Sequence, residues 1–293
     1  MTLLQALILS ILQGASELFP VSSLGHAVIV PALFHWSNIK QVLDPEGPFL
    51  PFIVTLHLGT ALALLIFYRR EWVRLVKAFF EQFTARGAAA KDAHLINMLV
   101  IGTIPAGLLA LIFEKKLRIL FGTPAYAAVF LILNGVLMIG GEFLRRKVTA
   151  RQLADPEGAP RRKLAQLTVW QALGIGAAQA LALLPGISRS GATITGGLLT
   201  GLDHEDSANY SFLLATPIIL AAAVKEVPKL RHLPPGSEHV GLYSAVGLVV
   251  SGVVAYLSVK FLTKYFETNR LDPFGYYCIA LGIVTLAVLH GGH

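Results

Sequence analysis

The sequence contains little charge for its length. Lys, Arg, Asp and Glu together make up 14% of the 293 residues, against roughly 25% in ordinary soluble domains. So few charged side chains could not cover the surface of a soluble protein of this size, whereas a surface that faces lipid needs no such cover. Together with a mean hydropathy of +0.65, this shortage predicts an integral membrane protein.

Other common features are also missing. The single cysteine, Cys278, lies in an apolar run, so an intramolecular disulfide is excluded and the redox compartment cannot be inferred. The N-terminus lacks the basic start and the small-residue cleavage site of a signal peptide. Neither zinc-type ligand spacing nor a Walker A motif is present. The net charge of +7 comes from basic loops without interleaved aromatic residues, which argues against nucleic acid as a partner.

Six apolar runs are long enough to cross a bilayer of about 30 Å as helices. They cover residues 50–68, 95–113, 125–144, 208–224, 241–262 and 274–290.

Two further apolar regions are interrupted by proline. Residues 3–34 break at 19–23, and residues 167–202 break at 185–191. Proline removes a backbone donor and disfavours helix in the residue before it. We interpret both regions as helix–turn–helix hairpins that enter the membrane and return, which requires burial in protein or contact with a wet cavity.

The basic residues set the orientation. Lys and Arg gather in residues 69–94 and 145–166, and the positive-inside rule places both segments in the cytoplasm. Counting outward, both termini are periplasmic, and the two hairpins enter from opposite sides. The sequence therefore predicts an all-α polytopic membrane protein, with six transmembrane helices and two re-entrant hairpins arranged as an inverted-topology repeat. In this single domain, 1–293, the first repeat covers about 1–144, a cytoplasmic linker about 145–164, and the second repeat about 165–293.

Two cytoplasmic segments carry further expectations. Residues 69–90 have the pattern of an amphipathic helix on the membrane surface, and residues 150–163 read as a polar loop.

The first hairpin carries an acid at membrane depth. Gln13 and Glu17 are four residues apart and share one helix face. A carboxylate inside the membrane costs at least a few kcal/mol unless it is partnered, so Glu17 is a candidate functional residue. The structural alternative is an interfacial glutamate that reaches water. His26 follows nearby, and in this cluster we predict a catalytic role for it rather than a purely structural one.

Three small residues follow the proline of this hairpin. Ser22 and Ser23 stand where the second half-helix should begin, and both are good N-cap residues. The N-terminus of a helix also suits phosphate. Gly25 would let a ligand approach the backbone closely.

The second hairpin carries Arg189 within a turn of glycine and serine. An arginine at this depth is expensive, and its guanidinium can bind a phosphate through two parallel hydrogen bonds. The structural alternative is that Arg189 pairs with Glu17, which would still bring the two hairpins face to face. The neighbouring residues expected to complete an anion-binding turn are Gly186, Ser188, Ser190, Gly191 and Thr193.

The remaining polar residues are expected to serve structure. Glu142 and Glu226 lie at the ends of spans and are expected to reach water. His57 lies within a span, where helix packing is the simpler role and support of the site the alternative. The ordinary first-turn acids of a helix are Asp203, Glu205 and Asp206.

Two motifs resemble those of a known family. Residues 13–26, QGASELFPVSSLGH, resemble the first signature of the bacterial undecaprenyl-diphosphatase family of the bacitracin-resistance type. Residues 185–193, PGISRSGAT, resemble its second signature, and residues 212–217, FLLATP, also look like a family segment. Length and hydropathy match over nearly the whole chain.

The resemblance implies an enzyme of the bacterial cytoplasmic membrane. It would convert a C55 polyprenyl diphosphate to undecaprenyl phosphate and inorganic phosphate, recycling the carrier lipid for peptidoglycan and conferring resistance to bacitracin. It also implies a site reached from the periplasmic side and a divalent cation, Mg²⁺ or Ca²⁺, with Glu17 as a ligand. The family has Glu or Gln at the position of Gln13. Gln here leaves Glu17 as the one acid of the motif, so the cation is expected to bind mainly through substrate phosphates.

The predicted site combines both hairpins. Its catalytic residues are Glu17, Ser23, His26 and Arg189, and its substrate-binding residues are Gln13, Ser22, Gly25, Gly186, Ser188, Ser190, Gly191 and Thr193. Three nucleophiles remain open: Ser23 activated by His26, a water activated by His26 or Glu17, and His26 itself. The expected partners are the lipid substrate and membrane lipids, and the sequence is compatible with a homodimer.

A transporter is the competing class. Inverted repeats with broken helices are a transporter design, so a flippase for polyprenyl phosphate, alone or combined with phosphatase activity, is the alternative function. A purely structural scaffold would leave Glu17 and Arg189 at depth without a purpose.

Overall fold

The computed structural model describes all residues except 37–46, 84–89, 121–122, 155–162, 232–237 and 292–293. Every regular element in the described part of the chain is helical. Six helices contain a stretch long and apolar enough to cross a membrane, which confirms the six predicted spans. They are α4 (Phe49–Phe67), α6 (Ala90–Leu120), α7 (Pro124–Ala154), α10 (His204–Glu226), α11 (Glu238–Tyr265) and α12 (Asp272–Gly291).

Two helical hairpins stand where the sequence predicts them. The first joins α1 (Leu3–Ser16) to α2 (Ser23–Leu33). The second runs from α8 (Val169–Ala180) through the short η2 (Leu181–Leu183) to α9 (Arg189–Leu199). Both chain reversals contain the expected proline. That the hairpins re-enter the membrane, and that the chain is an inverted repeat, remain predictions.

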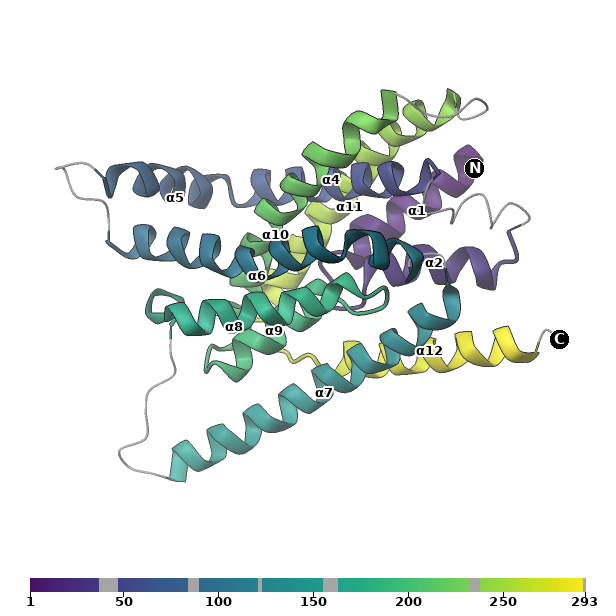
Figure 1. Cartoon of the computed structure of the whole chain (residues 1–293). Coiled ribbons are helices and arrows are strands. Elements are labelled where there is room, and N and C mark those ends of the chain that lie inside the picture. The colour runs from purple at the N-terminus through teal and green to yellow at the C-terminus, as the bar shows by residue number, and fades with distance from the viewer. Residues whose placement is uncertain (37–46, 84–89, 121–122, 155–162, 232–237, 292–293) are drawn as a thin grey trace.

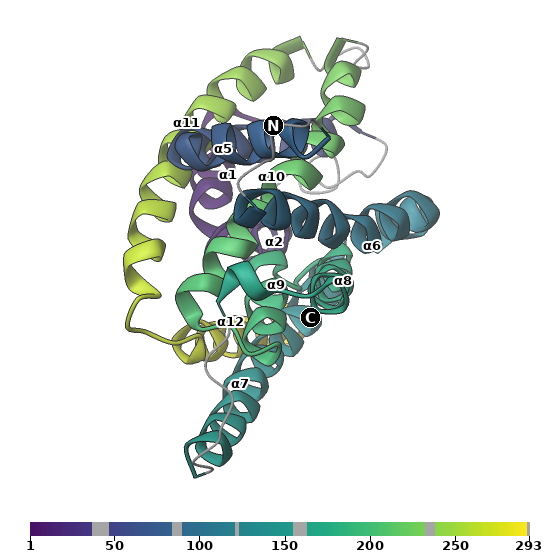
Figure 2. The same cartoon turned by 90° about the vertical axis from the view of Figure 1, so that its left-hand side faces the viewer.

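The hairpins pack against opposite halves of the chain. Helix α1 lies along α11, and α8 lies along α6. Figure 1 shows the start of α1 and the end of α12 at one end of the molecule, with the C-terminal ends of α5 and α7 at the other. In both views α7 and α12 lie side by side (Figure 1, Figure 2), and α4 makes similarly extensive contact with α11. This crossed packing carries the tips of both hairpins to the middle of the molecule.

The two segments predicted to be cytoplasmic differ in part from the prediction. Helix α5 (Arg69–Glu81) forms the expected helix and buries Leu75 and Ala78, whereas its position on the membrane surface remains a prediction. Helix α7 continues to Ala154. The predicted linker therefore begins as helix, and the polar loop at 150–163 is wrong for 150–154. Arg and Lys are good helix formers, and Arg146 pairs with Asp272 of α12. Residues 155–162 lie outside the described residues. Two short 3₁₀ segments complete the fold: η1 (Leu164–Gln166) and η3 (Val227–Arg231).

The two glutamates at span ends are more buried than expected. Glu142 is 0% exposed, contacts the ring of His204, and accepts a hydrogen bond of 3.1 Å from the backbone N–H of Leu271. The expectation that it reaches water is therefore wrong, because the start of α10 and the turn before α12 cover this part of α7. Glu226 is also buried, at 6% exposed, and accepts a hydrogen bond of 2.8 Å from Lys229.

Asp203, Glu205 and Asp206 occupy the roles expected of them. Asp203 caps α10 by accepting a hydrogen bond of 2.8 Å from the N–H of Asp206, and the other two acids stand in the first helical turn.

Candidate active site

Glu17 is the centre of the candidate site. It follows the last residue of α1 and is 7% exposed. Its Oε2 accepts hydrogen bonds from Gln13 Nε2 at 3.0 Å and from Ser23 Oγ at 2.5 Å, and His57 Nε2 lies 3.2 Å from the same atom. The shared face predicted for Gln13 and Glu17 is therefore confirmed, and the alternative that Glu17 reaches water is wrong. Three groups, from α1, α2 and α4, converge on one carboxylate oxygen.

Arg189 reaches the other oxygen of Glu17 from the second hairpin. Its Nε and Nη2 both lie 3.4 Å from Glu17 Oε1, and Nη1 donates to the carbonyl of Ser211 on α10 at 3.0 Å. The pairing considered as a structural alternative is present, and it brings the hairpins face to face. Both distances to Oε1 are longer than the 2.7–2.9 Å typical of a charge-assisted hydrogen bond. The guanidinium therefore lies near the carboxylate but does not form a short bidentate hydrogen bond with it.

Backbone contacts fix the two hairpin tips against each other. Asn134 of α7 donates from Nδ2 to the carbonyl of Pro20 at 3.0 Å, and its Oδ1 accepts from the N–H of Ser188 at 3.0 Å. Ser190 Oγ donates to the carbonyl of Phe19 at 3.2 Å. Asn134 is 0% exposed, so one buried amide satisfies a backbone group from each turn. This arrangement compensates for the backbone hydrogen bonds that the two chain reversals remove.

Glycine permits the close approach of the tips. A Cβ at Gly25 would lie 3.1 Å from the Cα of Gly186, so the space beside Gly25 is filled by the other hairpin. Gly186 has φ of +108°, a conformation that side chains disfavour. A Cβ there would also lie 2.2 Å from the carbonyl oxygen of Ala127. The structure gives both glycines a packing role, where the sequence suggested access for a ligand.

Replacing Gly186 with alanine is expected to lower the midpoint of thermal unfolding in detergent by about 4–10 °C, because the new methyl group meets both a strained φ and a backbone oxygen. Gly140 is the matched control, since a Cβ there has nothing within 4 Å. Gly140→Ala should leave the midpoint unchanged or slightly raised. Equal midpoints for the Gly186 variant and the wild type would contradict the crossing of the hairpins at this residue.

His26 is held by two partners other than Ser23. Its Nδ1 lies 2.8 Å from the carbonyl oxygen of Ser22, and its Nε2 lies 2.7 Å from the hydroxyl of Tyr277 on α12. The two rings also stack, with centroids 5.7 Å apart. Because a carbonyl only accepts, Nδ1 carries the proton in this arrangement and Nε2 accepts from the tyrosine. Ser23 instead donates a hydrogen bond to Glu17. The geometry therefore favours Glu17 over His26 as the group that would accept the proton of Ser23.

The predicted serines and threonine mostly form hydrogen bonds with backbone groups. Ser22 caps α2 by accepting from the N–H of Gly25 at 3.2 Å, with φ of +69°, which is unusual for a residue with a side chain. Ser188 caps α9 by accepting from the N–H of Gly191 at 3.1 Å. Thr193 Oγ1 is 2.6 Å from Ser211 Oγ and ties α9 to α10. The caps aim the N-termini of α2 and α9, both of which favour an anion, at the region around Glu17.

Four residues of the site carried little or no sequence signal: His57, Asn134, Ser211 and Tyr277. The sequence offers support of the site by His57 only as the alternative to helix packing, and its contact with Glu17 favours that alternative. The others stand in the long apolar helices of the third, fourth and sixth spans, where a lone amide, hydroxyl or phenol is common. Only the packing of α7, α10 and α12 around the hairpins brings them to the site.

Comparison with known proteins identifies the family. The family model described as bacitracin resistance protein BacA matches residues 6–284. The chain belongs to this family. A protein of Chromobacterium violaceum named undecaprenyl-diphosphatase 2 is 48% identical over 290 residues, covering 98% of each chain. A protein of Mycolicibacterium paratuberculosis named undecaprenyl-diphosphatase is 47% identical over 97% of this chain and 96% of the relative. A protein of Acidiphilium cryptum with the same name is 45% identical over 100% of both chains.

The site of this BacA-family chain offers limited ligation to a divalent cation. Among the described residues no group of three or more His, Cys, Asp or Glu side chains could hold a metal ion. One observation does fit a cation: Gln13 Oε1 is buried and has no hydrogen-bond partner, and it belongs to the side chain that bonds Glu17. An amide oxygen beside a carboxylate suits Mg²⁺ or Ca²⁺ when phosphate oxygens and water supply the remaining ligands.

Proposed function

We propose that this protein hydrolyses undecaprenyl diphosphate to undecaprenyl phosphate and inorganic phosphate, as the names of its relatives indicate. The product is the carrier lipid for peptidoglycan synthesis, and its recycling accounts for resistance to bacitracin, the property after which the family is named. One observation supports the proposal most strongly. Ser23, a hydroxyl nucleophile, and Arg189, a phosphate-binding cation, contact the two oxygens of the same carboxylate.

The first proposed step is exchange of partners at Arg189. The side chains of His57 and Arg189 keep 21% and 11% of their surface exposed, so both remain partly accessible from outside the protein. A diphosphate entering there offers the guanidinium a bidentate partner of higher charge than the carboxylate. Arg189 then turns from Glu17 Oε1 to the phosphate, while Nη1 stays anchored by the carbonyl of Ser211. The N-termini of α2 and α9 supply further N–H donors to the same anion.

The second proposed step is transfer of the terminal phosphoryl group. Ser23 Oγ gives its proton to Glu17 Oε2, 2.5 Å away, and bonds to the terminal phosphorus while the bridging P–O bond breaks. Undecaprenyl phosphate leaves as an anion and needs no proton. Water then bonds to the phosphorus of the phosphoserine while the bond from Ser23 Oγ to phosphorus breaks, and Glu17 returns its proton to Ser23 Oγ. One proton of the water stays on the inorganic phosphate, and the other is released to solvent. Positioning and electrostatics supply most of the acceleration in such transfers.

His26 acts in this scheme as a positioning residue. Its hydrogen bond to the carbonyl of Ser22 and its contact with Tyr277 hold the turn that presents Ser23 to Glu17. A second part of the proposal is a divalent cation held by Glu17 and Gln13 Oε1 together with the substrate phosphates. Such an ion would reduce the negative charge on the phosphate oxygens during transfer.

The test is phosphate release from purified protein in detergent, where no membrane sides exist. We expect release from undecaprenyl diphosphate that is lost on chelation of divalent cations. Brief reaction with substrate labelled in the terminal phosphate, followed by acid quenching, should leave the label on Ser23, and Ser23→Ala should abolish both labelling and turnover. Tyr210 donates to the backbone of Met98 away from Ser23, so Tyr210→Phe should fold and keep both.

Each other outcome has a distinct meaning. Label on His26 would assign the nucleophile to that ring. Turnover without label at either residue would favour a water activated by Glu17. Absence of phosphate release with several diphosphates and cations would overturn hydrolysis and favour the transporter alternative.

The finer topology is also part of the proposal. Both termini face the periplasm, the site opens toward that side, and the basic residues of α5 and α7 face the cytoplasm. The positive-inside rule supports this assignment, and labelling of single cysteines placed near Met1 and on α5 tests it in intact cells. A homodimer remains a prediction that the mass of the purified protein in detergent would check.

A further inference from the structure

A large apolar groove runs between α4, α6 and α10. Its volume is about 720 Å³, which is within the range of pockets that bind small molecules. Apolar side chains form nearly all of its wall, including Leu50 and Val54 of α4, Ile104 and Leu108 of α6, and Ile218 of α10. Ile104 and Leu108 are 47% and 55% exposed, so the groove is open along α6 to the surrounding lipid.

The groove adjoins the candidate active site along two helices. On α4, Leu50 and Val54 precede His57 by seven and three residues, so all three share one helix face. His57 contacts Glu17. On α10, Ile218 stands seven residues after Ser211, whose carbonyl holds Arg189. Leu183 of the second hairpin also lines the groove. The helices α4 and α10 and the second hairpin therefore contribute residues to both the site and the groove.

Small residues leave the groove open without being needed for helix packing. Gly107 and Ala110 of α6 line it together with Ala221 and Ala222 of α10. Small residues in membrane helices usually mark close helix contact. Here α6 packs mainly on α8 and only lightly on α10, and a Cβ at Gly107 would meet one atom alone, Ile218 Cδ1 at 3.9 Å. The space beside Gly107 is available to a ligand.

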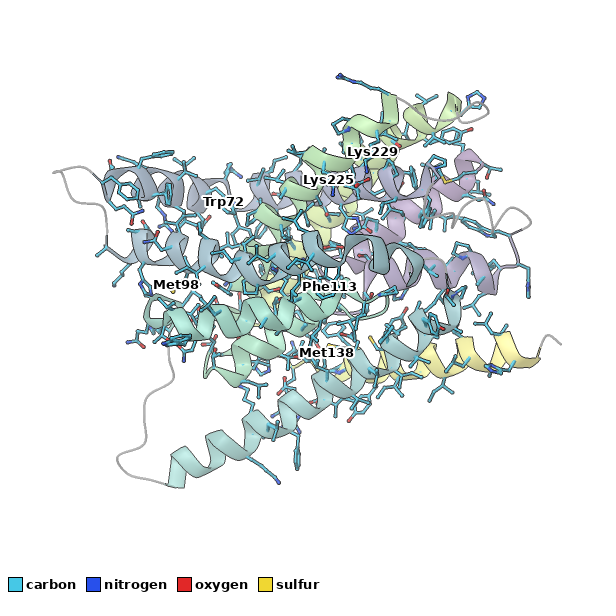
Figure 3. The ribbon with its side chains drawn as sticks, in the orientation of Figure 1. Trp72, Met98, Phe113, Met138, Lys225 and Lys229 are labelled. Atoms are coloured by element: carbon cyan, nitrogen blue, oxygen red, sulfur yellow. The ribbon has the colours of Figure 1, made fainter. Side chains whose placement is uncertain are left out.

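The groove extends along much of α6. Trp72 of α5 lines one part of it and Lys225 of α10 another, and Figure 3 shows these two residues at different positions along the length of α6. From Ile96 to Leu111 its wall on α6 covers fifteen residue steps, or roughly 22 Å of helix. The groove is therefore long and apolar, with polar atoms confined to a few residues.

We propose that this groove holds the polyprenyl chain of the substrate while its diphosphate lies at Glu17 and Arg189. The inference rests on the proposed function. A long apolar groove fits a linear isoprenoid chain, and its place on the same helices as the site matches a ligand whose apolar tail is covalently joined to an anionic head. Burial in the groove adds binding free energy in proportion to the number of chain carbons covered.

The experiment fills the groove with larger side chains and compares substrates with two lengths of polyprenyl chain. Gly107→Leu and Ala222→Leu place side chains in the groove, and Gly140→Leu on α7 is the matched control because a Cβ there has nothing within 4 Å. KM and kcat are measured in detergent for undecaprenyl diphosphate and for farnesyl diphosphate, whose shorter chain covers less of the groove. For undecaprenyl diphosphate we expect KM to rise roughly tenfold in both groove variants with little change in kcat, the effect of losing burial of about two methylene groups.

Farnesyl diphosphate reports whether the site itself is intact. Its kcat/KM should change less than about threefold in the same variants, and Gly140→Leu should resemble the wild type with both substrates. An unchanged KM for undecaprenyl diphosphate, or an equal loss with both chain lengths, would overturn the proposal. Loss of co-purifying phospholipid from Gly107→Leu with no change in KM would assign the groove to membrane lipid instead. If the wild type hydrolyses neither substrate, the proposed function fails. The groove is then tested by comparing how much undecaprenyl diphosphate the wild type and the groove variants bind.

Discussion

Replacing Glu17 with glutamine is expected to lower kcat/KM for undecaprenyl diphosphate by roughly 10³- to 10⁴-fold, the range of a lost general base. The amide keeps the size of the side chain but cannot accept the proton of Ser23, which lies 2.5 Å from Oε2. It also removes the charge that Arg189 and His57 face. The measurement is steady-state release of inorganic phosphate in detergent.

A second buried glutamate provides the control for Glu17→Gln. Glu142 is also buried, and it too contacts a histidine, His204, but it stands near the start of α10 and α12 and outside the proposed site. Glu142→Gln should keep turnover within about threefold of the wild type, because the proposed chemistry makes no use of it. Turnover of Glu17→Gln within tenfold of the wild type would contradict the assignment of Glu17 as the base.

Replacing Arg189 is expected to have the second-largest effect. Arg189→Ala should lower kcat/KM by roughly 10³-fold or more, because it removes the bidentate phosphate contact and leaves the buried carboxylate of Glu17 without its cation. Arg189→Lys should recover only part of this loss. A lysine supplies a point charge, and it cannot bond the phosphate and the carbonyl of Ser211 with one planar group.

The double variant separates a catalytic role of Arg189 from a structural one. If the pair with Glu17 were only a structural ion pair, removing both charges in Glu17→Gln/Arg189→Ala would restore folding and activity together. In the proposed site the double variant regains thermal stability relative to Arg189→Ala and remains inactive. Near-normal turnover in Arg189→Ala or Arg189→Lys would remove the phosphate-binding role.

Much of the fold follows from the sequence. The six spans are long apolar runs, and their length is set by the thickness of the bilayer and the rise of a helix, so composition alone locates them. The two hairpin turns are marked by Pro20 and Pro185, whose effect on the backbone is local. The continuation of α7 to Ala154 was missed because basic residues suggest a loop by their topology, while their helix propensity is high.

The candidate site is predictable only in part. Glu17 and Arg189 stand out because a charge in an apolar segment is expensive wherever it lies. His57, Ser211 and Tyr277 do not stand out, because their roles depend on which helix faces the hairpins. The hydrogen bond of Ser23 to Glu17 rather than to His26 likewise depends on how the turn between α1 and α2 brings these side chains together.

The sequence by itself determined that the chain is a bundle of apolar helices, with two broken segments that carry an acid and an arginine. Local backbone preferences and the cost of charge in lipid are sufficient for that conclusion. Only the tertiary structure decided that Glu17 joins Ser23, His57 and Arg189, that Gly25 and Gly186 serve the crossing of the hairpins, and that an apolar groove adjoins the site. These features depend on contacts between residues far apart in the chain, and no local pattern encodes which of them meet.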